Sequence, residues 1–145
     1  MNALSPRGVA LIQEFEGCRL TAYRDQRGVL SIGTGHTGPD VTEGLVWSQA
    51  QADAALRNDT SFAAAAINRY VDVALNQNEF DALCSLAFNI GVGAFRSSTL
   101  LRMLNMGDHP GAAMQFAVWD RVNGEQNAGL SRRRAAEQSL FLTPA

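Results

Sequence analysis

The chain has 145 residues, of which 46% are hydrophobic and 18% charged, so it is long enough for one compact domain and too apolar for a disordered one. The net charge is −2, and the twelve basic residues, all arginine, gather only at Arg132–Arg134. Nucleic-acid-binding proteins usually carry a stronger basic excess, so we expect no nucleic-acid partner.

No apolar run approaches the roughly 20 residues that span a bilayer, so we expect no stable insertion into a membrane. The first residues lack the basic and apolar regions of a signal peptide, which predicts synthesis in the cytoplasm. Without a secretion signal, Cys18 and Cys84 are expected to be reduced thiols. His36 and His109 lie far apart in sequence and no Cys/His cluster has metal-ligand spacing, so we expect no metal and no cofactor.

A helix is predicted at the N-terminus, followed by a small sheet. Ser5 and Pro6 are typical of an N-cap and a first helical residue, and a one-sided apolar stripe then runs to Gly17. Glu16 would therefore end this helix. From Thr21 to His36, short β-branched and apolar runs broken by glycines predict a hairpin sheet with tight turns.

The rest of the chain, from Ser48 on, is predicted to be helical. Ser48 with Gln51 forms a possible capping box before a long helix to about Tyr70, and Asn76 with Glu79 begins another that Gly91 would stop. Shorter helices are predicted over 99–105, 109–121 and 131–142. The fold class is therefore α+β, a single domain with a sheet lobe at about 18–47 and a helical lobe at about 48–145. The N-terminal helix would pack on the helical lobe, and the helix from Ser48 could bridge the two.

The first 36 residues contain groups that could cleave a sugar chain. Glu16 and Asp25 lie nine positions apart, and Ser31 follows six positions later. Two carboxyl groups can supply a general acid for a glycosidic oxygen and a carboxylate for the opposite face, while a hydroxyl can orient water. Each residue also has an ordinary interpretation. Glu16 could be a solvated charge at a helix end, Asp25 a turn residue before Gly28, and Ser31 an ordinary serine in a strand. For Asp25 both interpretations can hold, because a rigid turn can place a carboxylate.

The stretch from Glu16 through Asp25 and Ser31 to Gly35 and His36 resembles the signature of phage-type lysozymes, glycoside hydrolase family 24. That signature is Glu-x8-Asp-x5-Thr, and Ser31 here stands in the place of threonine. The resemblance implies a lysozyme-like fold and an endolysin that hydrolyses the β-1,4 bond between N-acetylmuramic acid and N-acetylglucosamine in peptidoglycan. Glu16 would protonate the leaving oxygen, and Asp25, helped by Ser31, would position water, with inversion as is usual in the family.

A second block, over 81–101, resembles another part of the same lysozymes, although 91–95 alone also reads as a helix end and a turn. The resemblance implies substrate contacts, together with a structural pair of a histidine and an aspartate. The expected substrate-binding residues are Gly35, Phe88, Asn89, Ser98 and, more weakly, Gln115, and the expected pair is His36 with Asp59. One arginine of 132–134 would reach Glu16 from behind.

The resemblance also implies a monomeric phage or prophage endolysin, made in the host cytoplasm and released to the wall by a separate holin-type protein. Two alternatives stay open. A lytic transglycosylase can work with a single glutamate and would not need Asp25. A peptidoglycan-binding protein could keep the cleft while being catalytically weak. The products separate these functions: a hydrated reducing end, a 1,6-anhydro end, or no product.

Overall fold

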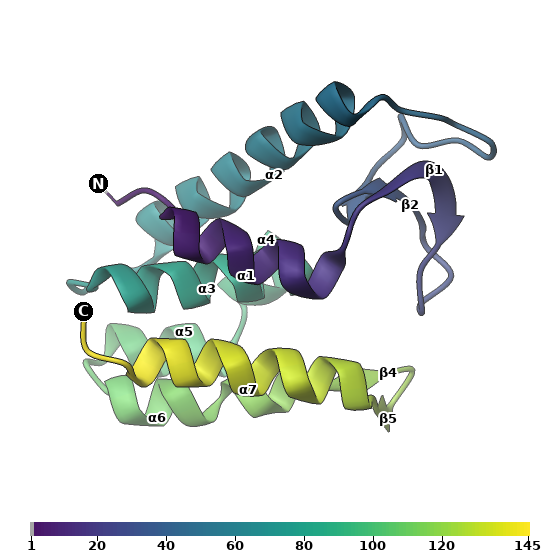
Figure 1. The fold of residues 1–145 in the computed structure, drawn as a ribbon. Helices are drawn as coiled ribbons and strands as arrows, with labels where there is room; N and C mark the ends of the chain where they lie inside the picture. The colour runs from purple at the N-terminus through teal and green to yellow at the C-terminus, as the bar shows by residue number, and fades with distance from the viewer. Residues whose placement is uncertain (1) are drawn as a thin grey trace.

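The computed structural model describes residues 2–145 and has an α+β architecture in which helices outweigh the sheets (Figure 1). In chain order the elements are α1 (Pro6–Glu16), β1 (Arg19–Arg24), β2 (Leu30–Gly33), β3 (His36–Thr37), α2 (Gln49–Tyr70), α3 (Gln77–Ile90), α4 (Val92–Arg96), α5 (Thr99–Asn105), α6 (His109–Met114), the 3-10 helix η1 (Phe116–Trp119), β4 (Arg121–Val122), β5 (Glu125–Gln126) and α7 (Ala128–Leu142). The long helix α2 runs from the side of the sheet to the helical part of the molecule (Figure 1). No helix within residues 2–145 is both long and apolar enough to cross a membrane.

The helix starts predicted from capping residues are confirmed. The Ser5 side chain accepts a hydrogen bond from the backbone of Gly8, and α1 ends at Glu16 because Gly17 adopts φ +66°. Both bonds of a capping box are present at the start of α2, between Ser48 and Gln51. The same arrangement, built from an asparagine and a glutamate, begins α3. The C-cap at Gly17 fixes where α1 stops, and thereby where Glu16 lies.

The three-stranded sheet is antiparallel with the order β1-β2-β3. Ser31 on β2 is opposite Tyr23 on β1 and Thr37 on β3. Residues directly opposite one another in a sheet point their side chains to the same face. Tyr23, Ser31 and Thr37 therefore share one face of this sheet.

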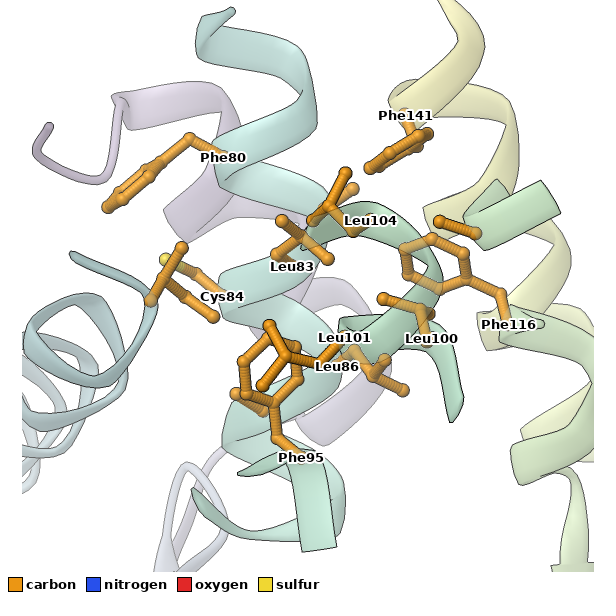
Figure 2. Close-up of a cluster of buried hydrophobic side chains, with 14 of the residues drawn as sticks. Phe80, Leu83, Cys84, Leu86, Phe95, Leu100, Leu101, Leu104, Phe116 and Phe141 are labelled. Carbon is orange, nitrogen blue, oxygen red and sulfur yellow. The ribbon is translucent and has the colours of Figure 1, made fainter. Parts of the chain in front are cut away.

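The main hydrophobic core lies in the helical part, around α3 (Figure 2). Phe80, Leu83, Leu86 and Cys84 of α3 are fully buried there. Within residues 2–145, no member of this cluster comes from β1, β2 or β3. Cys84 is a free thiol in the core and Cys18 is a free exposed thiol, which agrees with the expectation of two reduced cysteines.

Three elements differ from the sequence-based expectations. The predicted helix over 109–121 is shorter: α6 ends at Met114, η1 follows, and β4 and β5 then form a hairpin. Asn123 and Gly124 adopt positive φ at the tip of this hairpin, which is the conformation that an Asn-Gly turn favours. The 91–95 segment lies mostly in the short helix α4, and α7 begins at Ala128 because the Asn127 side chain caps it three residues before the predicted start.

Candidate active site

A pocket of about 330 Å³ lies between the end of α1, the sheet and the end of α3. Glu16 and Asp25, the two carboxylic acids singled out in the sequence, both line it. Its other lining residues are Gln26, Arg27, Val29, Gly35, Thr37, Phe88, Asn89, Ile90, Gly91, Val122 and Leu130. The fold thus brings together a helix end and a β-turn that are separate elements of the chain.

The Glu16 side chain is 19% exposed and is held from behind by an arginine of α7, as the sequence resemblance implied. Its Oε2 atom lies 3.1 Å from Nη1 of Arg133, whose own side chain is 3% exposed. On the other side, the carboxyl group rests against Gly35, where an added Cβ atom would lie only 2.9 Å from Oε2. Gly35 also has φ +72°, so both the backbone and the space favour glycine there. Burial, together with the charge of Glu16, raises the pKa of the neighbouring Tyr23.

Asp25 lies in the tight turn between β1 and β2, and the turn fixes one of its two carboxylate oxygens. Oδ1 accepts hydrogen bonds from the backbone N–H groups of Arg27 at 2.8 Å and Val29 at 2.9 Å. Within residues 2–145, no protein group donates to Oδ2. Asp25 is therefore both a turn residue and a carboxylate with one oxygen available at the pocket, so the two interpretations of this residue are compatible.

Ser31 lies behind the pocket, not on its surface. The residue is 2% exposed, and its hydroxyl donates to the backbone carbonyl of Val29 at 3.1 Å. Because the N–H of Val29 binds Asp25, Ser31 supports the turn that holds the carboxylate. Ser31 shares its sheet face with Thr37, which does line the pocket.

Three of the five expected substrate-binding residues line the pocket, and two do not. Gly35, Phe88 and Asn89 are at the pocket wall. Ser98 instead forms the N-cap of α5, with its hydroxyl bonded to Phe95 O and Leu101 N. Gln115 follows α6 in the helical part, and neither residue lines this pocket or the one adjoining it. A serine used as a helix cap has its donor and one lone pair already occupied.

His36 makes the expected pair with Asp59 and a second one that was not expected. Its Nδ1 lies 2.7 Å from Asp59 on α2, and its Nε2 lies 2.9 Å from Asp40. Burial lowers the pKa of His36, but the hydrogen bonds and charges of the two aspartates outweigh burial and leave the pKa above its ordinary value. The pair connects β3 to α2 and lies beside the pocket, as a structural contact would.

A second pocket adjoins the first and shares Gly35, Thr37, Phe88 and Gly91 with it. Phe62 of α2 lines this extension and is 69% exposed. Phe62, Thr37 and Val122 were not among the site residues expected from the sequence. The Asn123-Gly124 pair was a signal for the hairpin that carries Val122, whereas an exposed phenylalanine in an alanine-rich helix gave none.

Residues 13–137 of this chain match the sequence model of the family described as phage lysozyme. The chain belongs to the phage lysozyme family. A relative named endolysin, from Acyrthosiphon pisum secondary endosymbiont phage 1, is 45% identical over 95% of this lysozyme and 97% of its own length. The endolysin of Salmonella phage P22 is 41% identical over 99% of this lysozyme and 100% of its own length.

Among solved structures, the muramidase domain of SpmX from Asticaccaulis excentricus has a TM-score of 0.88 and 43% identity, and the match covers 99% of this lysozyme and all of that domain. These similarities confirm the resemblance to the phage lysozymes and the α+β lysozyme fold. This lysozyme is thus a glycoside hydrolase, a muramidase endolysin that degrades peptidoglycan.

Proposed function

We propose that Glu16 is the general acid and Asp25 the water-positioning base for cleavage of the β-1,4 bond between N-acetylmuramic acid and N-acetylglucosamine. The observation that supports this assignment is that both carboxyl groups line one pocket, each held by a separate element. Arg133 and Gly35 restrain Glu16, and the β-turn restrains Asp25. Restraint of this kind keeps catalytic groups in a productive geometry.

In the proposed reaction, Glu16 transfers its proton to the glycosidic oxygen as the bond to the anomeric carbon breaks. A water molecule held by the Oδ2 side of Asp25 attacks the anomeric carbon, and Asp25 accepts the proton that the water loses. The guanidinium of Arg133 then faces the Glu16 carboxylate formed by the transfer. The expected outcome is inversion at the anomeric carbon.

The glycan would lie along the two adjoining pockets. Asn89 and Phe88 form one wall, and Gly35 offers backbone close to the acid. The amide oxygen of Asn89 accepts a hydrogen bond from Arg134 at 2.8 Å, which leaves the NH2 group of Asn89 to donate to the substrate. Ser31 would act through Val29 as a positioning residue for Asp25.

The experiment that tests this assignment is digestion of purified peptidoglycan in 18O water. A hydrolase places one heavy oxygen in each new reducing end, and Asp25→Asn should strongly suppress this release because an amide cannot act as a base. Asp53→Asn, at an exposed aspartate of α2, is the matched control and should release label at the wild-type rate. Unlabelled anhydro ends, or undiminished turnover by Asp25→Asn, would instead support a single-acid transglycosylase.

We also propose that the enzyme acts as a monomer, is made in the host cytoplasm and reaches the wall after a separate holin-type protein permeabilises the membrane. The family supports this route, because an endolysin must meet peptidoglycan outside the cytoplasmic membrane. Expression of the chain alone should leave host cells intact until chloroform permeabilises them. Lysis without permeabilisation would show that no separate release protein is needed.

A further inference from the structure

Behind the pocket lies a carboxylate that has no direct contact with it. Glu137 of α7 is 0% exposed. Its Oε2 accepts a hydrogen bond from the Ser85 hydroxyl of α3 at 2.5 Å and from Nε of Arg133 at 3.2 Å. Its Oε1 lies 2.8 Å from Nε of Arg134, close enough for charge attraction although the two groups are not aligned as a hydrogen bond.

The two arginines that bind Glu137 each continue to a wall of the pocket. Arg133 reaches Glu16 through Nη1 at 3.1 Å, and Arg134 reaches the Asn89 side chain through Nη2 at 2.8 Å. Arg133 and Arg134 are 3% and 1% exposed. Arg134 also donates to Oε2 of Glu137 through Nη2 at 3.3 Å. Among residues 2–145, Glu137 is therefore the one side chain bonded to both arginines, and it connects the wall that carries the acid with the wall that carries Asn89.

The four charged groups are balanced. Glu16 and Glu137 supply two negative charges, and Arg133 and Arg134 supply two positive ones. Burial raises the pKa of Glu137, against the opposing effect of the two guanidinium groups, and burial lowers the pKa of Arg134 to about 10. In surroundings of low dielectric constant, charges interact more strongly, so the removal of one charge changes the protonation equilibria of the others.

We propose that Glu137 is a positioning residue for the reaction, which shares the charge of Arg133 with Glu16 so that the acid can still carry a transferable proton. Without this sharing, Arg133 would pair with Glu16 alone and favour its ionised form. Other charged or titratable groups also face the network: Tyr23 of β1 lies near Glu16, Asp25 lines the same pocket as Glu16, and Arg27 of the β1–β2 turn lies near Arg134. The proposal rests on the assignment of Glu16 as the acid.

The test is the pH profile of kcat/KM in a set of charge-changing variants. Glu137→Gln leaves one excess positive charge beside the acid, so the alkaline limb should move to lower pH by about one unit. Arg134→Gln leaves one excess negative charge, so the limb should move to higher pH. The double variant restores the balance, and its limb should return toward the wild-type position.

Glu79→Gln is the matched control, because Glu79 is also buried but is paired with His109 outside the pocket. Its limb should stay at the wild-type pH. Circular dichroism melts identify variants that do not fold, and the opposite shift in Arg134→Gln tests the proposal even if Glu137→Gln fails to fold.

A limb that stays in place in the folded Glu137→Gln and Arg134→Gln variants, with kcat lowered equally at every pH, would overturn the proposal and leave Glu137 as packing support. A failure of the catalytic assignment looks different. In that case Glu16→Gln itself would retain wild-type activity, whatever the variants of Glu137 do.

Discussion

At the residue scale, the Glu16 carboxyl group has a charged neighbour on one side and an uncharged one on the other. The guanidinium of Arg133 comes from α7, and the backbone of Gly35 follows β2. Glu16→Gln keeps the size of the side chain but removes the transferable proton. We expect lysis of permeabilised cells to fall by about 100-fold or more while the melting temperature changes little. Glu14→Gln, at an exposed position of the same helix, should keep wild-type activity. Near wild-type lysis by Glu16→Gln would remove this residue from the mechanism.

Ser31 offers a second test, because its hydroxyl reaches Asp25 only through Val29. Ser31→Ala removes one hydrogen bond from the turn, so we expect kcat to fall about fivefold to tenfold. Ser31→Thr keeps the hydroxyl, and a β-branched residue suits a strand, so kcat should be retained or raised. The measurement is the rate of reducing-end release at saturating peptidoglycan. Equal rates for Ser31→Ala and wild type would make this hydroxyl irrelevant to the reaction.

The sequence was sufficient to place Glu16 and Asp25, because a helix end and a turn before glycine are local features. The resemblance added Gly35, Phe88 and Asn89, whereas the residue that holds Glu16 from behind depends on contacts between distant segments. Arg133 was one of three adjacent arginines, and only the packing of α7 against α3 shows which of them reaches Glu16. Ser98 was misjudged for the opposite reason, since its role as the N-cap of α5 is local and its place directly before the helix predicted over 99–105 indicated that role.

At the element scale, the contact of His36 with Asp59 connects β3 to the bridging helix α2. The pKa of His36 is raised in the folded protein, so its stabilising contribution is complete below the unfolded value of about 6.5 and is lost as pH rises through the folded value. His36→Asn should therefore lower the unfolding free energy by about 1.5–3 kcal/mol at pH 5.5 and by less at pH 9. Thermal melts at the two pH values measure this difference.

The two aspartate partners of His36 provide the control for this prediction. Asp59→Asn should behave like His36→Asn, whereas Asp40→Asn should cost much less, because the Asp40 side chain is 60% exposed. A loss of stability that is the same at both pH values would show that packing against Trp47, and not charge, is the main contribution of His36.

The elements that could be predicted from the sequence are the helices that begin with a recognisable N-cap residue. Ser5, Ser48 and Asn76 gave correct starts for α1, α2 and α3. The segment after α5 was harder, because its apolar residues suit a helix while Asn123 and Gly124 impose a turn. The turn accounts for the place of Arg121 in β4, whereas the end of α6 at Met114 and the 3-10 helix η1 that follows are not visible in the apolar periodicity.

At the scale of the whole molecule, the core is placed unevenly. The hydrophobic cluster includes residues of α3, α5 and α7 but none of β1, β2 or β3 within the described chain. Segments with few buried apolar contacts open at lower free energy. Hydrogen exchange should therefore protect amides of α3 at least roughly tenfold more than those of β1. Equal protection across both would show that the sheet and the helical part unfold as one unit.

The two cysteines give the enzyme one accessible sulfur and one inaccessible sulfur. Burial raises the pKa of the Cys84 thiol, which suppresses the thiolate that alkylating reagents need, while Cys18 is exposed between α1 and β1. A thiol assay should therefore count about one reactive group in the native enzyme and two in urea. The Cys18 sulfur also lies near Gln49, the first residue of α2, at 3.9 Å. A fluorophore or spin label attached to this single sulfur would report on the junction of α1, the sheet and the bridging helix while the enzyme works on a cell wall.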